Sequence, residues 1–393
     1  MKKDVLFVIN NLNCGGAEKS LISLLHTMDY SRYNVDLFLF KHEGLFFNKV
    51  PKHVNILDEP SEYQYFDMPI KEATIKCLRQ GRLDIAFSRI CAGYIFKSEK
   101  NKARCEQRVW RYLSKSLQTI NKKYDVAIGY LEKNPVYFCI EKVKADKKIG
   151  FIHTDYDKLG MDSKIDMGYF HSLNHLVTVS EECANVLRQR FPIYNDKIGV
   201  IHNVVSPSTI NKMSQEKVDI EHKGIKLVSV GRLSSEKGFD LAIEACKDLV
   251  ENGYDIKWYI IGEGKDRDKL EKMIEENELQ DHFLLLGLKE NPYPYIRVAD
   301  IYVQPSRFEG KSIAIDEAKI LHKPIVVTNF STAKDQIDNE ENGIIVDMDA
   351  HSLSEGIKKL IHHEELRNKL INNLSDEKLG TESEITKLYT LFK

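Results

Sequence analysis

The sequence lacks the residue spacings that mark disulfide frameworks and structural zinc sites. Its seven cysteines are scattered, with no Cys-x-x-Cys and no clustered histidines, a pattern typical of reduced thiols in a cytosolic protein. No apolar run approaches the roughly 18 residues that span a bilayer. The apolar run Val5–Ile9 is too short for a signal peptide, and polar Asn10 and Asn11 follow it. We therefore expect a cytoplasmic protein whose contact with a membrane is at most peripheral.

A strong net charge is also missing from the chain as a whole, although it is present locally. The formal net charge of −2 at pH 7 gives no reason to expect a nucleic-acid partner. Residues 71–123, however, contain fourteen Lys or Arg against four Asp or Glu, a local net charge of +10 that leaves −12 for the rest of the chain. This asymmetry predicts an anionic partner, such as a membrane surface.

What the sequence does contain is a repeated alternation of short apolar runs and helical patterns. The 393 residues are enough for two domains. Runs such as Val5–Ile9 indicate buried parallel strands, and segments such as Gly238–Val250 indicate crossover helices. We predict an α/β protein with two doubly wound, Rossmann-like domains that face a central cleft. The expected parts are a first domain at 1–205 with a basic insert at about 71–123, a linker at 206–224, a second domain at 225–380 and a terminal helix at 381–393.

The most informative motif is the pair Glu309 and Glu317, which follows a predicted strand. On a helix, their spacing puts them about 80° apart and more than two turns along the axis. That is too far for the paired carboxylates of a glycosidase, which lie about 5–9 Å apart. Between them, Gly310, Lys311 and Ser312 mark a helix start, where backbone N–H groups favour phosphate. The motif fits a nucleotide diphosphate sugar held at both ends, although a lone pair of this kind is more often solvated on a surface helix.

A second motif, GRLSSEKGFD at 231–240, follows the first strand of the second domain. Arg232 can donate to two phosphate oxygens at once, and Lys237 adds a compact positive charge. Cations placed where a diphosphate departs would stabilise the transition state more than the ground state. The alternative is an exposed basic loop without a ligand.

Two further features lie at predicted strand ends of the first domain. Gly15 and Gly16 follow the first strand, and paired glycines permit positive φ and close approach to a ligand. The G-x-G-x-x-G motif of NAD-binding domains is absent, and a simple tight turn is the alternative. His153 ends the apolar run Lys148–His153, which would place its ring at the cleft. The alternative for His153 is a structural histidine with satisfied hydrogen bonds.

Taken together, these segments resemble the retaining GT-B glycosyltransferases that carry the E-x7-E motif (glycosyltransferase family 4, glycosyl transferases group 1), in particular the bacterial surface-polysaccharide type. The resemblance covers nearly the whole chain, and the order and spacing of its motifs are specific. They are GGAE at 15–18, His153, GRLSSEKG at 231–238, the turn Ile261–Gly264 and FEGKSIAIDEA at 308–318.

The resemblance implies a role for each of these residues. Glu309 and His153 would contact the transferred sugar near its reacting carbon, and Glu317 would bind the ribose. Arg232 and Lys237 would hold the diphosphate. Other residues that would line the substrate site are Gly15, Gly16, Gly231, Gly262, Gly310, Lys311 and Ser312.

The resemblance also implies the reaction. A hexose or N-acetylhexosamine would pass from a UDP- or GDP-sugar to a hydroxyl of a glycan acceptor with retention of configuration and without a metal or other cofactor. Retention is commonly explained by front-face attack, in which the leaving phosphate takes the acceptor proton. Glu309 would then be a positioning and electrostatic residue, and not a nucleophile.

One departure from the resemblance concerns Lys311 and Ser312, where many relatives have a small or apolar pair. Lys311 would add a positive charge beside the phosphates. Because this loop helps to shape the sugar pocket, the departure leaves the identity of the sugar open.

The basic segment contains two amphipathic patterns at helical spacing. The first has Arg82 and Arg89 beside an apolar stripe of Leu83, Phe87, Ile90 and Tyr94. The second has an apolar stripe of Val109, Leu113, Leu117 and Ile120 opposite basic Arg104, Arg108, Arg111 and Lys115. Either stripe could lie in an anionic membrane interface or pack on the first domain's sheet. We expect packing for the second, and for the first both outcomes stay open.

Relatives with a basic first domain often act at the inner face of the plasma membrane on lipid-linked acceptors, so the resemblance favours a lipid-linked glycan acceptor. Two other functions stay open. A nucleotide-sugar epimerase on the same fold would need an acid–base set, for which His153 is the one candidate. A catalytically silent partner subunit would be expected to lose residues such as Lys237 and Glu309, which are present.

Overall fold

The chain folds into two α/β units in this computed structural model, which describes residues 2–13, 15–220 and 222–393. Unit 1 comprises Met1–Asn203 and Ser383–Lys393, and unit 2 comprises Val204–Glu382. The change of unit therefore falls before the predicted linker. Part of that linker is not a free connection, because Ser206-Pro207 starts the helix α10 (Pro207–Met213), and proline is favoured in a first helical turn. Ile210 of this helix is buried in the core of unit 2.

Unit 1 is built on a sheet of seven parallel strands in the order β3-β2-β1-β4-β5-β6-β7. The strand order reverses between β1 and β4, which are paired in parallel. The five residues Val5–Ile9 are fully buried, as expected for a parallel strand that is covered on both faces. The strands are β1 (Lys3–Ile9), β2 (Tyr33–Leu39), β3 (Val54–Ile56), β4 (Ile120–Gly129), β5 (Val143–Ile152), β6 (His175–Thr178) and β7 (Ile198–Val200).

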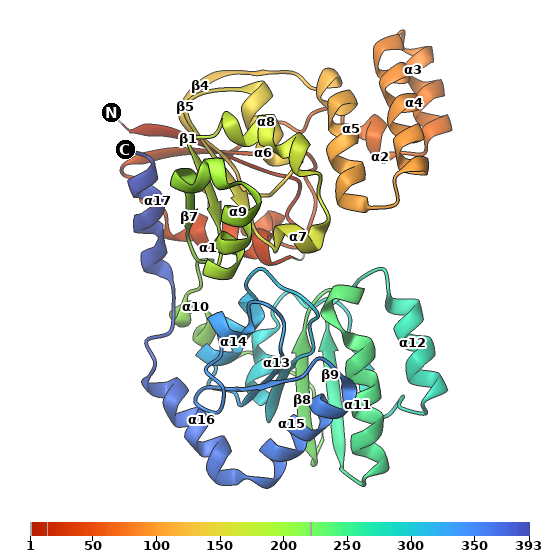
Figure 1. The fold of residues 1–393 in the computed structure, drawn as a ribbon, viewed down its shortest axis with the longest axis vertical. Coiled ribbons are helices and arrows are strands. Elements are labelled where there is room, and N and C mark those ends of the chain that lie inside the picture. The colour runs from red at the N-terminus through yellow and green to blue at the C-terminus, as the bar shows by residue number, and fades with distance from the viewer. Residues whose placement is uncertain (1, 14, 221) are drawn as a thin grey trace. The chain divides into compact units, whose positions relative to one another are not determined.

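The helices of unit 1 include the predicted terminal one, which belongs to this unit and is not a separate part (Figure 1). The Tyr389 ring stacks on Tyr33 with centroids 4.8 Å apart, and Lys3 Nζ donates to the Phe392 carbonyl at 2.7 Å. The helices are α1 (Gly16–Thr27), α2 (Gln64–Asp67), α3 (Ile70–Arg79), α4 (Leu83–Ser98), α5 (Lys102–Ser116), α6 (Asn134–Lys142), α7 (Tyr156–Leu159), α8 (Ser163–His171), α9 (Glu181–Arg190) and α17 (Ile385–Leu391).

Unit 2 repeats the same plan with six parallel strands in the order β10-β9-β8-β11-β12-β13. Here the order reverses between β8 and β11. The strands are β8 (Ile225–Val230), β9 (Ile256–Ile261), β10 (Phe283–Leu285), β11 (Ile301–Gln304), β12 (Ile325–Thr328) and β13 (Ile344–Val346). The remaining helices are α11 (Phe239–Glu251), α12 (Arg267–Glu276), α13 (Tyr293–Val298), α14 (Ile313–Ile320), α15 (Ala350–His362) and α16 (Glu364–Asp376).

The basic insert forms the helices α3, α4 and α5, of which α3 and α4 stand beyond α5 at the edge of unit 1 (Figure 1). The second amphipathic pattern packs inward as predicted, since Val109 and Leu113 are buried. Ile120 does not continue that helix and instead begins β4. Arg89 was placed beside the first stripe, but it lies on the opposite face of α4. It is buried there and donates to the carbonyls of Tyr65 and Met68 at 2.8 Å each.

The first amphipathic pattern is exposed. Four large apolar side chains lie on the solvent face of α4, and the residues between them, such as Ile85 and Ala92, are fully buried. The exposed fractions are 66% for Leu83, 67% for Phe87, 52% for Ile90 and 74% for Tyr94. No helix in the described residues is long and apolar enough to cross a membrane.

Candidate functional site

The candidate site of unit 2 is built from two loops that leave β8 and β11, the strands between which the sheet order reverses. Ligands of open α/β sheets bind at such a point, beyond the carboxyl ends of the strands. Gly238 joins the two loops because its φ is +66° and a Cβ there would lie 1.9 Å from the Pro305 carbonyl oxygen. The Arg307 backbone N–H also donates to the Glu236 carbonyl at 2.8 Å. The GRLSSEKG loop and the turn before Glu309 therefore form one body.

Arg307 reinforces this junction with its side chain. Its guanidinium bonds both carboxylate oxygens of Asp240, at 2.8 and 2.9 Å, and Nη1 also donates to the Ser235 carbonyl at 2.9 Å. Burial works to raise the pKa of Asp240, but the hydrogen bonds and charge of Arg307 outweigh it and the pKa is lowered. Asp240 therefore stays ionised as the partner of Arg307.

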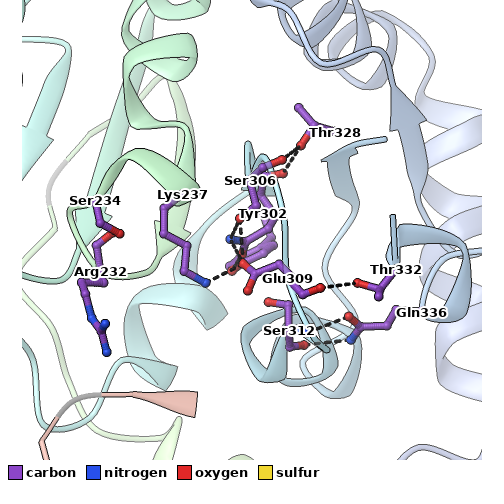
Figure 2. A network of polar contacts seen from close by, with 11 residues as sticks. Arg232, Ser234, Lys237, Tyr302, Ser306, Glu309, Ser312, Thr328, Thr332 and Gln336 are labelled. Atoms are coloured by element: carbon purple, nitrogen blue, oxygen red, sulfur yellow. Dashed lines mark hydrogen bonds and ion pairs between the residues drawn. The ribbon is translucent and has the colours of Figure 1, made fainter. Parts of the chain in front are cut away.

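Glu309 and Lys237, predicted for the sugar and the diphosphate, are in direct contact (Figure 2). Lys237 Nζ donates to Glu309 Oε1 at 2.5 Å, and the two side chains are only 20% and 11% exposed. The same carboxylate oxygen accepts from Ser306 Oγ at 2.7 Å. An ion pair this sheltered holds both groups in a defined place.

A buried hydrogen-bond network at the end of β11 holds Ser306, whose hydroxyl donates to Glu309. The Gln304 amide donates to Ser306 Oγ at 2.8 Å and accepts from the Tyr302 hydroxyl at 2.5 Å, and Thr328 Oγ1 donates to the Ser306 carbonyl at 2.5 Å. Burial and the charges of Glu317 and Glu309 hold the pKa of Tyr302 well above its usual value, so its hydroxyl remains a donor. None of these supporting residues was singled out from the sequence.

The start of α14 lies where the sequence placed it, with Ser312 as the N-cap. The Ser312 backbone N–H donates to Gln336 Oε1 and its carbonyl accepts from Gln336 Nε2, both at 2.8 Å (Figure 2). The Ser312 N–H is thus already engaged. The N–H groups of the first turn, residues 313–315, have no acceptor within the helix and are the ones that can meet an anion.

Lys311 differs from its predicted place beside the phosphates. Its side chain is 10% exposed, and Nζ lies 3.6 Å from Asp316 Oδ2. Both residues line a pocket with Lys319 and Gln336. In this conformation the ammonium lies near an acid in the first turn of α14, and its predicted contact with the phosphates stays a prediction.

Glu317 is more enclosed than a ribose ligand requires. Its exposed fraction is 1%, and its carboxylate accepts from the Tyr293 hydroxyl at 3.1 Å. Tyr293 thus occupies part of the carboxylate's hydrogen-bonding capacity in this structure, and the predicted contact with a ribose stays a prediction.

The other predicted residues of unit 2 are Arg232 and three glycines. Arg232 is exposed, and Figure 2 shows its side chain apart from the Lys237–Glu309 pair, with no contact drawn to either residue. Gly262 is required by packing, since a Cβ there would lie 1.9 Å from the Gly231 carbonyl oxygen. A Cβ at Gly231 would make only ordinary contacts of 3.4 Å or more. Gly310 lies in the loop directly before the N-cap of α14.

In unit 1, the positive φ considered for the glycine pair is not present, and their close approach to a ligand stays a prediction. Gly15 has φ −148°, Gly16 is the first residue of α1, and neither is among the glycines with positive φ. A Cβ at Gly15 would meet the end of the flexible Glu18 side chain. Part of this loop motif, Cys14, lies outside the described residues. The described cysteines are free thiols, as expected.

His153 follows β5, with its ring centroid 4.9 Å from that of Tyr130 and 5.7 Å from that of Phe151. Neither ring nitrogen makes a hydrogen bond of acceptable geometry. Burial lowers the pKa of His153 to about 3, against smaller opposing effects of the Tyr130 carbonyl and Asn203. The imidazole is therefore neutral at physiological pH.

Comparison with known proteins gives the same fold. A family model described as "Glycosyl transferases group 1" matches residues 211–376, which include both loops and α14. Staphylococcus aureus TarM, in complex with Fondaparinux, alpha-GlcNAc-glycerol and UDP, has a TM-score of 0.70 at 16% identity, with all of both chains covered. WaaG, a glycosyltransferase involved in lipopolysaccharide biosynthesis, has a TM-score of 0.66 at 13% identity over 98% of this chain and 99% of that one.

Among curated relatives, a Campylobacter jejuni N-acetylgalactosamine-N,N'-diacetylbacillosaminyl-diphospho-undecaprenol 4-alpha-N-acetylgalactosaminyltransferase is 32% identical over 183 residues, 46% of this chain and 49% of that protein. A Staphylococcus aureus poly(ribitol-phosphate) alpha-N-acetylglucosaminyltransferase is 26% identical over 262 residues, 63% of this chain and 51% of that protein. The chain thus spans about half the length of these relatives.

Proposed function

We infer that this chain is a retaining glycosyltransferase, which transfers a hexose or N-acetylhexosamine from a UDP- or GDP-sugar to a glycan hydroxyl. The match to the glycosyl transferases group 1 model and the GT-B fold support this inference. The observation that carries this proposal is the sheltered Lys237–Glu309 pair beside the start of α14. It combines a cation, an anion and free helix N–H groups at the switch point of one sheet. A nucleotide sugar needs each of them.

In the proposed reaction, the diphosphate lies at the first turn of α14 and draws on the charges of Lys237 and Arg232. The bond between the anomeric carbon and the phosphate oxygen breaks. The acceptor hydroxyl attacks from the same face and its proton passes to the departing phosphate oxygen. Negative charge grows on the diphosphate, where fixed cations and helix N–H groups stabilise it. Glu309 orients the sugar hydroxyls, and neutral His153 supplies a hydrogen bond near the reacting carbon.

Lys237 would interact first with the Glu309 carboxylate and then also with the diphosphate of the donor. Without donor it neutralises Glu309, and with donor it would lie between the carboxylate and the phosphate. No metal or other cofactor is required by this scheme, because the leaving group is met by protein cations.

The first test is binding. We expect one class of nucleotide, UDP or GDP, to raise the thermal midpoint of the purified protein, because a ligand that binds only the folded state stabilises it by about 2.7 kcal/mol at a hundredfold excess over its dissociation constant. The shift should be the same with and without EDTA, and turnover should also survive the chelator. A panel of nucleotides and nucleotide sugars in a thermal-shift assay measures the binding. Product formation with and without EDTA measures the turnover. Loss of transfer in EDTA that Mg²⁺ restores would contradict the metal-independent scheme.

The acceptor is proposed to be a lipid-linked glycan at the inner face of the plasma membrane. The name of the Campylobacter jejuni relative includes a diphospho-undecaprenol group. In this chain, the support is the exposed stripe of α4, together with the local charge of +10 in residues 71–123. A helix with large apolar residues on one face and basic residues around it can lie in an anionic interface.

Replacing Phe87 and Ile90 with Ser should lower binding to anionic vesicles at least about tenfold, because burying one large apolar side chain contributes roughly 1.5–3 kcal/mol. The fold should persist, since both side chains are more than half exposed. Ile193→Ser removes an equally exposed apolar residue, 70% exposed, outside the insert, and is the matched control.

Vesicles of phosphatidylglycerol and phosphatidylcholine, compared with phosphatidylcholine alone in a co-sedimentation assay, separate the charge from the apolar contribution. Equal binding of the double variant and the Ile193 control to anionic vesicles would rule out α4 as the docking face.

A further inference from the structure

The sheet of unit 1 has its own switch point, between β1 and β4, and a second group of polar residues lies there. Asn10 directly follows β1, Glu132 lies in the loop that follows β4, and Asn134 is the first residue of α6 after that loop. His153 follows β5, the next strand in the sheet. The roles proposed above use His153 and leave both asparagines unassigned.

Strand register places these residues beyond the same edge. Val8 on β1 pairs with Gly129 on β4, which pairs with Gly150 on β5. β4 ends at that row, whereas β1 continues to Ile9 and β5 to Ile152. Because neighbouring strands lie about 4.8 Å apart, the segments that follow them leave the sheet within one small region of its edge.

These side chains have buried polar atoms that lack hydrogen-bond partners. The Asn10 and Asn134 Oδ1 atoms are buried and have no hydrogen-bond partner, and the same holds for Nδ1 and Nε2 of His153. They make up four of the eight buried side-chain nitrogen or oxygen atoms without a partner among the described residues. A buried group without a partner costs about 1–3 kcal/mol, and native proteins keep few of them. Their concentration at a switch point indicates that a ligand supplies the partners.

The hydrogen-bond donors and acceptors of these side chains indicate the kind of ligand that would bind them. An asparagine amide both accepts and donates, and a neutral imidazole has one nitrogen of each kind. A hydroxyl group also does both. The nearby cation, Lys133, is paired with Glu106 at 2.5 Å and is not directed to a phosphate. The Tyr130 and Phe151 rings, stacked with centroids 4.8 Å apart, flank the imidazole. This combination suits an uncharged ring that carries several hydroxyls.

The loop that leads to Asn134, the first residue of α6, is held in a fixed shape. Lys133 has φ +67° and ψ −119°, a conformation that a non-glycine residue keeps only when its surroundings impose it. Behind it, α6 packs so closely on β4 that a Cβ at Gly129 would lie 2.6 Å from the Val136 Cα. The backbone position of Asn134 is therefore set before a ligand arrives.

We propose that Asn10 and Asn134 form, beside His153, a hydroxyl-binding subsite for an uncharged sugar ring. This inference rests on the proposed function and identifies which residues of unit 1 select the sugar. The ring belongs either to the acceptor or to the sugar of the donor, since both offer the same hydroxyl groups.

The test uses the full chain with Asn10→Ala and Asn134→Ala, and with the exposed Asn195→Ala as the matched control. Calorimetry measures affinity for UDP or GDP, for the corresponding nucleotide sugars, and for methyl glycosides of hexoses and N-acetylhexosamines in the presence of the nucleotide. We expect each variant of the subsite to lose at least about tenfold affinity for one kind of sugar ligand, with nucleotide affinity unchanged. Loss for methyl glycosides identifies the acceptor sugar, and loss for nucleotide sugars identifies the donor sugar.

Stability separates this role from a structural one. Removing an amide that has no protein partner should leave the thermal midpoint unchanged or raise it, whereas removing a structural hydrogen bond should lower it. The proposal is wrong if both variants bind every sugar ligand as the wild type does, or if both lose affinity only together with several degrees of thermal midpoint. If the wild type binds no nucleotide and transfers no sugar, the proposed function itself fails. If the wild type transfers sugar and both variants transfer it and bind sugar ligands equally well, only the subsite is rejected.

Discussion

Glu309→Gln and Lys237→Ala are each expected to reduce sugar transfer at least about a hundredfold. The reason is that Lys237 places a fixed cation where the diphosphate departs and Glu309 orients the transferred sugar, and single preorganised groups of this kind contribute about 10²–10³ in turnover. Steady-state turnover of the nucleotide sugar measures the effect. Since the groups are only 20% and 11% exposed, each single change also leaves a sheltered charge without its main partner, and stability should fall.

A double variant separates the two effects. Lys237→Met with Glu309→Gln removes both charges and should recover much of the stability lost by either single change, but none of the activity. Lys359→Met removes a surface pair with Glu340 in the same unit and serves as the control that should keep full turnover. Near-normal turnover in the purified single variants would remove the basis of the proposed site.

Gly238→Ala is expected to inactivate the protein and destabilise unit 2 by at least about 2 kcal/mol. A Cβ at this position would lie 1.9 Å from a backbone oxygen, that of Pro305, which cannot swing aside as a side chain can. The positive φ of +66° adds roughly 1–2 kcal/mol for any residue with a Cβ. The two loops must then separate, and Lys237 moves away from Glu309. Chemical denaturation and turnover of the same preparation measure both losses.

Gly253→Ala is the matched control for this change. Gly253 has φ +82°, yet a Cβ there would meet nothing within 4 Å. The control therefore carries the conformational penalty without the collision, and it should lose about 1 kcal/mol and no activity. Equal losses in both variants would show that the backbone conformation, and not the junction with Pro305, accounts for the effect.

The fold was predictable because its strands are buried on both faces. Uniformly apolar runs such as Val5–Ile9 and Ile301–Gln304 appear in the structure as strands of parallel sheets. The strand that the sequence did not reveal, β3, is three residues long, and of these only Val54 is buried. A strand that short at the edge of a sheet has too little apolar pattern to be detected.

The site was predictable in position and less so in contacts. Two loops of charged residues after β8 and β11 indicate the switch point, but a sequence does not show which charges neutralise each other without a ligand. The pairs Lys237–Glu309 and Lys311–Asp316 depend on side-chain conformations. Gln336 was also missed, because it lies 24 positions from the Ser312 backbone that it holds.

The return of α17 to unit 1 has a consequence for how the chain is made. Unit 2 is one continuous stretch, Val204–Glu382, inserted within unit 1. During synthesis, unit 2 can complete its fold while unit 1 still lacks the contacts of Tyr389 and Phe392 with its second and first strands. Cloned separately, unit 2 needs a single segment. Unit 1 needs a circular permutant or a short linker in place of the insertion.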